Sequence, residues 1–354
     1  MVDVKNIGTL FIFFLLAICW SCSVDASDSF GNDSVPSSSS ISNDTIEYIK
    51  PPELSCKEIL ALREYDQDNK PFWDYYYDIR YYVFLDTKIL GFNNHNTVYY
   101  IDYGKDSVWT KTTNLFGDSS GVVTDHEPNL IDSILIVTRK LAENYQVCRT
   151  VEFFDNWVCT SFGTDEINVI NDGMYFYLET KDQLKYSSDG ISWIPLDVSI
   201  KHLKNGFMKD STHFIFSSWG NLYWSNNLVH WDSTSIPIEQ SGRKVVYGNG
   251  VFVYAGPWGE LLYSTDLKKW SPASKGGGSP WLEDLIFANG FFIAVGTASS
   301  MGNTKIVLTS YNGKDFKSQT YCGETDRCTS ISYDGHEKFY IRNDSGMEMY
   351  QLVK

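Results

Sequence analysis

The sequence predicts an all-β protein, a β-propeller of about seven four-stranded blades. Three observations support this fold class: a repeat of about forty residues, an Asn-Gly or Asp-Gly pair in phase with it, and runs of Val, Ile, Phe and Tyr between these two signals. Short strands repeated at this period are typical of propeller blades. About 310 residues follow the amino-terminal region, enough for seven such units.

The amino terminus is typical of an export signal. Lys5 precedes an apolar run from Ile7 to Trp20, which is shorter than the ~20 residues of a transmembrane helix. Two cleavage sites are compatible with this segment. Ordinary signal peptidase would cleave after Ala26, whereas cleavage after Ser21, as in a bacterial lipoprotein, would leave Cys22 as a lipidated first residue.

The amino-acid composition separates a short polar segment from the rest of the chain. Residues 23–44 are rich in Ser, Asp and Asn and are expected to form a disordered linker. We therefore assign residues 1–22 to the export signal and residues 45–354 to the propeller. The protein is expected to be exported, in the extracellular space or cell envelope, and to meet a membrane only through a lipid anchor at Cys22. With 29 Lys and Arg against 44 Asp and Glu, the net charge is −15, so nucleic acid is not expected as a partner.

The repeat is clearest in four segments that begin at Leu184, Leu222, Leu261 and Val307. In each, Ser follows an aromatic residue or Thr, Asp or Asn comes two positions after the Ser, and Trp or Phe closes the segment. The residues of this frame are Ser187, Asp189, Gly190, Trp193, Ser225, Asn227, Trp231, Ser264, Asp266, Trp270, Ser310, Asn312 and Phe316. We expect the polar residues to bond their own turn and the aromatic residues to fill the space between sheets, rather than to form a metal ring.

A second signal marks the first hairpin of each unit. Asn-Gly or Asp-Gly pairs occur at residues 172–173, 205–206, 249–250, 289–290 and 334–335. These pairs tolerate the positive φ values of type I′ turns, and strand-like runs flank them. Each unit therefore predicts a strand, an Asn-Gly turn, a second strand, a loop, a third strand, an Asp or Asn turn, and a fourth strand.

The repeat weakens toward both ends of the chain. Trp109 and Trp157 close two further units, while Thr329–Leu352 supplies only three strands. Ring closure then requires an outer strand from the other terminus, for which Thr45–Lys50 is the candidate. Cys56–Glu64 has the pattern of a short helix outside the repeat. If residues 45–115 packed differently, the ring would have six blades.

The stretch from Ser187 to Trp193 resembles an Asp-box of the BNR kind, found in sialidase-like and sortilin-type propellers. The resemblance covers residues ~120–320 and implies the fold while saying little about function. Sialidases of this fold use an Arg-Ile-Pro motif and a cluster of three arginines on the substrate carboxylate. The chain has no Arg-Ile-Pro, so sialidase activity is not expected, and the protein is expected to be non-catalytic. No zinc-type spacing or nucleotide-binding loop occurs, so neither a metal nor a cofactor is expected.

The variable middle loop of each unit is where binding residues are expected, because loops on a constant scaffold carry function. Trp219-Gly220 and Trp258-Gly259 occupy equivalent loops of neighbouring units. An exposed Trp is a flat apolar platform for sugar rings or peptide side chains; alternatively, each Trp covers the rim of the core between blades. The candidate ligand-binding residues are Trp219, Trp258, Trp281, Glu260, Glu283 and Asp284.

Three functions follow from these residues. The first is a binding module that recognises a glycan or an extracellular protein through the loop face. The second is a glycoside hydrolase that acts on extracellular polysaccharide through carboxylates such as Glu260, Glu283 or Asp284. The third is a structural surface scaffold.

Cysteine usage agrees with export. Five cysteines follow residue 22, an odd number that leaves one without a partner within the chain. Cys148 and Cys159 flank a predicted strand turn and are candidates for one disulfide. Cys322 and Cys328 bracket a short loop and are candidates for a second.

Overall fold

The computed structural model describes residues 54–60, 79–85, 88–93, 97–102, 110–113, 116, 121–123, 126–152, 156–239, 241–275, 280–299, 302–318, 328–343 and 346–352. The chain divides into two units, Met1–Tyr48 and Ile49–Lys354. The expected export signal and linker lie outside the described residues, so these expectations stay predictions. The expected location of the closing strand, Thr45–Lys50, is wrong, because β1 (Leu54–Leu60) fills that place beside β29 (Gly346–Leu352). In the described part of the chain, no helix is long and apolar enough to span a membrane.

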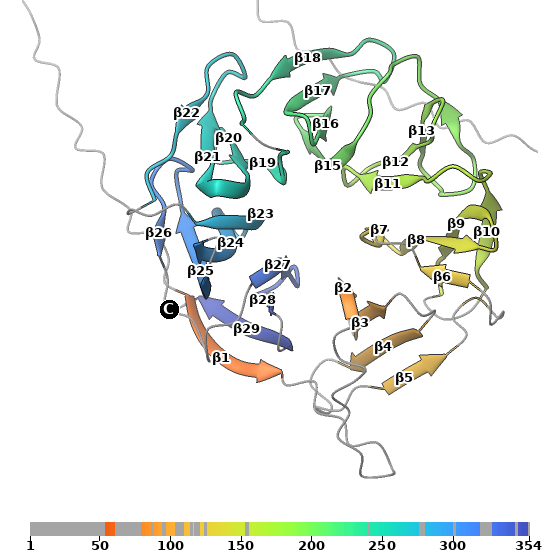
Figure 1. The fold of residues 1–354 in the computed structure, drawn as a ribbon, viewed down its shortest axis with the longest axis horizontal. Coiled ribbons are helices and arrows are strands. Elements are labelled where there is room, and N and C mark those ends of the chain that lie inside the picture. The colour runs from red at the N-terminus through yellow and green to blue at the C-terminus, as the bar shows by residue number, and fades with distance from the viewer. Residues whose placement is uncertain are drawn as a thin grey trace, which may run out of the picture. The chain divides into compact units, whose positions relative to one another are not determined.

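Seven antiparallel sheets form a seven-bladed β-propeller, which confirms the predicted fold class and excludes the six-bladed alternative (Figure 1). Blade 1 holds β2 (Ile79–Phe84), β3 (Lys88–Asn93), β4 (Thr97–Asp102) and β5 (Thr110–Thr113). Blade 2 holds β6 (Gly121–Val123), β7 (Asn129–Ile131), β8 (Ile134–Leu141), β9 (Asn144–Thr150) and β10 (Val158–Ser161), with β6 and β7 both paired to β8. Blade 3 holds β11 (Asn168–Asn171), β12 (Phe176–Glu179), β13 (Leu184–Ser187) and β14 (Ile194–Pro195).

The remaining blades repeat this order from the inner to the outer strand. Blade 4 holds β15 (Leu203–Lys209), β16 (Thr212–Ser217), β17 (Asn221–Ser225) and β18 (Asp232–Ser235). Blade 5 holds β19 (Lys244–Gly248), β20 (Val251–Ala255), β21 (Leu261–Ser264) and β22 (Ser271–Pro272), with the 3-10 turn η3 (Pro257–Gly259) between β20 and β21. Blade 6 holds β23 (Trp281–Ala288), β24 (Phe291–Ser299), β25 (Gly302–Ser310) and β26 (Lys317–Ser318). Blade 7 holds β27 (Cys328–Tyr333), β28 (Lys338–Asn343), β29 (Gly346–Leu352) and β1 (Leu54–Leu60).

Strand β1 closes the ring, as a propeller with an incomplete carboxyl-terminal blade requires (Figure 1). It pairs antiparallel with β29 from Leu54 opposite Leu352 to Leu60 opposite Met347. The helix predicted over Cys56–Glu64 is therefore wrong for Cys56–Leu60, the part of it that the structure describes. The pairing register shifts between Cys56 and Glu58, and such a bulge interrupts the alternation by which a strand is recognised in a sequence.

The structure confirms some of the turns predicted at Asn-Gly and Asp-Gly pairs and contradicts one of them. At Asn249-Gly250 the two φ values are 46° and 78°, and at Asn289-Gly290 they are 51° and 84°, as type I′ turns require. The prediction for residues 205–206 is wrong, because these residues lie within β15 and the turn falls at Asp210-Ser211, with φ values of 47° and 64°. Asn205 instead joins blades: its amide donates to the Val245 carbonyl at 2.7 Å and accepts from the Val245 N–H at 3.1 Å.

The four turns before the outer strands share one hydrogen-bond pattern. The Ser hydroxyl accepts the N–H three residues later at 2.8–3.0 Å, and the Asp or Asn side chain accepts two N–H groups at 2.8–2.9 Å. Although partial burial opposes it, donation from the Ser192 and Ile191 N–H groups lowers the pKa of Asp189 to about 2. These side chains are occupied by their own turns. In the described part of the chain, no group of three or more His, Cys, Asp or Glu residues is placed to hold a metal.

The core lies between neighbouring blades. Trp193 packs against a cluster from blades 2 and 3, Trp231 against one from blades 3 and 4, and Trp270 against one from blades 4 and 5. Phe316 is buried between blades 5 and 6. Each aromatic residue of the repeat thus packs between two sheets, where burial of a ring of this size contributes most.

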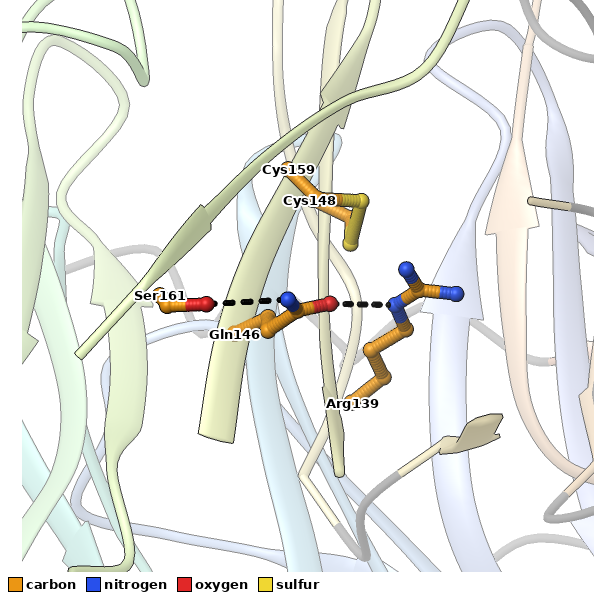
Figure 2. Close-up of a disulfide and its surroundings, with 5 residues drawn as sticks. All are labelled: Arg139, Gln146, Cys148, Cys159 and Ser161. Atoms are coloured by element: carbon orange, nitrogen blue, oxygen red, sulfur yellow. Dashed lines mark hydrogen bonds between the residues drawn. A yellow bond between two sulfur atoms is a disulfide. The ribbon is translucent and has the colours of Figure 1, made fainter. Parts of the chain in front are cut away.

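A disulfide joins Cys148 of β9 to Cys159 of β10, its direct partner in the strand register. Figure 2 shows Gln146 beside it, accepting from Arg139 Nε and donating to Ser161 Oγ, both at 2.9 Å. Cys328 is buried at the start of β27. Its predicted partner Cys322 lies outside the described residues, so that pairing stays a prediction.

Replacing both Cys148 and Cys159 by Ala is expected to lower the free energy of unfolding by about 2–3 kcal/mol, because the disulfide restricts the unfolded chain and fixes the outer strand of blade 2. Denaturation in urea measures the change. Reduced wild-type protein should match the double variant, and a difference below about 0.5 kcal/mol between oxidised and reduced protein would contradict this prediction.

Candidate functional site

The loops between second and third strands and the connections between blades lie at one end of the sheets, which we call the loop face. Hydrogen bonds tie them together: the Gly242 N–H, in the connection before β19, donates to the Ser218 carbonyl of the β16–β17 loop at 2.8 Å. The Ser218 N–H in turn donates to the carbonyl of His202, in the connection before β15, at 2.9 Å. A loop of blade 4 is thereby held by the connections on both of its sides.

Trp219 is the most exposed large apolar side chain on this face, with 69% of its surface accessible. Its ring lies 4.1 Å from the His202 ring, measured between centroids. His202 adopts a left-handed φ of 59°, and its N–H donates to Glu179 Oε1 at 2.7 Å. The pair of rings therefore stands on a fixed backbone while the outer face of Trp219 remains in solvent.

Trp258 repeats this arrangement one blade further. It lies within η3, is 58% exposed, and has a left-handed φ of 64°. Its ring centroid is 5.2 Å from that of Trp281, the first residue of β23. The Lys275 ammonium donates to the Gly259 carbonyl of the same turn. A left-handed backbone costs an ordinary residue about 1–2 kcal/mol, and such strain clusters at functional sites.

The three candidate carboxylates are already engaged within the protein. Glu260 accepts the Glu239 N–H at 2.7 Å and the Tyr254 hydroxyl at 3.0 Å. Burial, with the Glu260 charge next in size, raises the pKa of Tyr254, so its hydroxyl stays protonated as the donor. Glu260 therefore ties the η3 turn to the preceding connection.

Glu283 and Asp284 join neighbouring blades. Glu283 Oε2 lies 3.3 Å from a terminal nitrogen of Arg243, and Asp284 Oδ1 accepts from the Lys244 ammonium at 2.8 Å. The other oxygen of Asp284 accepts the Ile331 N–H of blade 7 at 3.0 Å. Both side chains are largely buried, so the structure does not bring the candidate acids together as an exposed pair.

Sequence reasoning missed the charged residues at the ends of the inner strands, which begin at the loop face. Three of them follow one another at the repeat spacing: Lys204 on β15, Lys244 on β19 and Asp284 on β23. The repeat spacing is the one feature of the sequence from which these three residues could have been recognised. Burial opposes the charge on Lys244, but Asp284 and then Glu127 raise the pKa of this lysine. Burial also raises the pKa of Glu127, which precedes β7 on blade 2.

Two hollows also lie on the loop face, both at blade 3. One of about 240 Å³ is lined by residues 180–183 together with Phe162, Asp165 and Lys185. The other, of about 320 Å³, is lined by residues 182–184 and 196–201. Neither of these two hollows is lined by a candidate Trp.

Fold and site together define a seven-bladed β-propeller that presents aromatic side chains on its loop face. No protein-family model matches the sequence, and no curated protein matches it. Solved structures share the fold. Virginiamycin B lyase from Staphylococcus aureus has a TM-score of 0.62 and 10% identity, over 85% of this chain and 100% of that one.

Two further solved structures have a somewhat lower TM-score. YCF48 bound to D1 peptide has a TM-score of 0.56 and 13% identity, over 87% of this chain and 96% of that one. The WD40 propeller domain of Doa1 has a TM-score of 0.56 and 13% identity, over 86% of this chain and 97% of that one. At these identities the likeness concerns the fold alone.

Proposed function

We propose that this protein is an exported, non-catalytic binding module that recognises an exposed segment of a partner protein through Trp219, Trp258 and Trp281. One observation carries the proposal: Trp219 and Trp258 occupy equivalent loops of neighbouring blades, and each exposes more than half of its side chain. Rigid, exposed aromatic residues are the side chains that most often dominate binding energy at an interface.

Three further observations support this function. The solved YCF48 propeller is bound to a peptide, so a propeller of similar fold accommodates this class of ligand. The disulfide of blade 2 suits an oxidising compartment outside the cytoplasm. We keep the export signal, with cleavage after Ser21 and a lipid anchor at Cys22 or cleavage after Ala26, and the Asp-box origin of the four turns as parts of the same proposal.

The arrangement of the candidate acids favours binding over hydrolysis. A glycosidase needs two carboxyl groups that reach the same bond. Glu260, Glu283 and Asp284 instead accept hydrogen bonds or ion pairs from their own protein. A sugar is the alternative ligand for the tryptophans, because an indole ring also stacks on sugar rings.

A selection from a displayed library of random peptides tests the proposal. The double variant Trp219→Ala/Trp258→Ala is expected to bind the peptides enriched on wild-type protein at least about thirtyfold more weakly, since even a single hot-spot residue contributes about 2 kcal/mol or more. Fluorescence anisotropy with individual enriched peptides measures the loss.

Val229→Ala/Ile194→Ala is the matched control. These two apolar side chains are 65% and 50% exposed, near the outer strands of blades 4 and 3 rather than on the loop face. The control should bind like wild type. Equal binding by the tryptophan variant would contradict the proposed site, and selection of sugars on a glycan array, with no peptide enriched, would replace the peptide by a glycan.

A further inference from the structure

Within the part of the chain that the structure describes, Lys204 on the loop face is a cation without an ion-pair partner. It lies at a bulge near the start of β15, where the register shifts between Leu203 and Asn205. Asn205, the next residue, bonds to Val245 of β19, so Lys204 lies beside the first residues of the neighbouring inner strand. Among the described residues, no side chain forms a hydrogen bond or an ion pair with the Lys204 ammonium.

Two cations at the start of the neighbouring inner strand each have a carboxylate partner. Arg243 pairs with Glu283, and Lys244 pairs with Asp284. Glu179 is occupied by the N–H groups of His202 and Leu203. Burial, and then repulsion by the positive charge of Arg243, lower the pKa of Lys204. An anion at this position would relieve that repulsion.

Trp219 is adjacent to these cations. Gly242, directly before Arg243, is hydrogen-bonded to Ser218, directly before Trp219. His202, whose ring contacts Trp219, is two residues from Lys204. The guanidinium-bearing side chain of Arg243 remains 35% exposed. Aromatic surface and positive charge thus adjoin on the loop face of a protein whose net charge is −15.

We propose that Lys204, assisted by the positive charge of Arg243, binds a carboxylate of an acidic side chain on the peptide segment that contacts Trp219. This inference rests on the proposed function and specifies it: the partner segment carries Asp or Glu beside its apolar residues. A hydrogen bond between an ammonium and a carboxylate contributes more than a neutral one.

Two displayed octapeptide libraries test the inference. They are identical except for one central position, which is Glu in the first library and Gln in the second. Wild-type protein is expected to enrich the Glu library about tenfold over the Gln library, as one charge-assisted hydrogen bond implies. In Lys204→Gln the ratio should fall to near one without loss of Gln-library binding, whereas Lys204→Arg should retain the preference.

Controls separate this inference from the function on which it rests. Lys269→Gln removes one exposed charge from the turn after β21 and should leave the ratio unchanged. Trp219→Ala should weaken binding of both libraries alike. If wild-type protein binds both libraries equally, or Lys204→Gln retains the preference, carboxylate recognition by Lys204 is overturned while peptide binding stands. If wild-type protein binds neither library, both carboxylate recognition by Lys204 and the proposed peptide binding are contradicted.

Discussion

A chain that lacks residues 1–60, and with them strand β1, is expected to lose at least about 5 kcal/mol of unfolding free energy. Six residue pairs join β1 to β29, from Leu54 opposite Leu352 to Leu60 opposite Met347. Backbone hydrogen bonds contribute about 1 kcal/mol each, and the loss of ring closure adds to them. Denaturation in guanidinium chloride measures the change, and sedimentation tests whether the uncovered edge of β29 promotes association.

The control for this truncation starts at Ile49, at the boundary of the second unit, and keeps β1. It should unfold at the same denaturant concentration as the full chain. If the chain that starts at residue 61 were equally stable, closure of the ring by β1 would contribute nothing to the propeller. A synthetic peptide of residues 54–60 should restore part of the lost stability if pairing with β29 is the cause.

The regular blades were predictable because their turns depend on local chemistry. Ser and Asp or Asn at fixed positions bond the backbone of their own turn, and this geometry is the same in all four copies. The closing strand was not predictable by the same means. Lys57 to Leu60 favours a helix locally, and only the unpaired edge of β29, almost three hundred residues away, makes it a strand.

The site was predictable only in part. Trp219 and Trp258 were recognisable because they occupy equivalent loops, and the structure exposes both. The roles of Glu283 and Asp284 depend on Arg243 and Lys244 of the next blade, which no local pattern specifies. The same limit applies to Lys204, because a missing partner is recognisable only after the neighbouring blades have been placed around it.

Substitution of Asp172, a buried carboxylate at the end of the sheets opposite the loop face, is expected to destabilise the protein strongly. Asp172 of blade 3 accepts the N–H groups of Met174 and Tyr175 at 2.9 and 2.8 Å. It also bonds the Tyr177 hydroxyl and His213 Nδ1, both at 2.7 Å. His213 lies on β16, so the carboxylate links two blades, and its own side chain has no exposed surface.

Asp172→Asn is expected to lower the free energy of unfolding by about 3 kcal/mol. Both carboxylate oxygens of Asp172 are hydrogen-bonded to surrounding groups, and the NH₂ group of Asn cannot accept a hydrogen bond, so buried donors lose their partner. Tyr177→Phe is the smaller, matched change and should cost about 1 kcal/mol, since it removes one donor and leaves the carboxylate paired with His213.

The pH dependence of the same variant distinguishes a charged Asp172 from a merely well-packed one. Burial opposes ionisation, but the bonds from His213, Tyr175 and Tyr177 outweigh it and lower the pKa of Asp172 below its ordinary 3.8. A group with a lowered pKa in the folded state stabilises the protein above its ordinary pKa, and this contribution disappears as the pH falls through the folded value. The stability difference between wild type and Asp172→Asn should therefore shrink as the pH falls below the ordinary pKa of 3.8 for Asp. A difference that stays constant in acid would mean that the cluster depends on shape and not on the charge of Asp172.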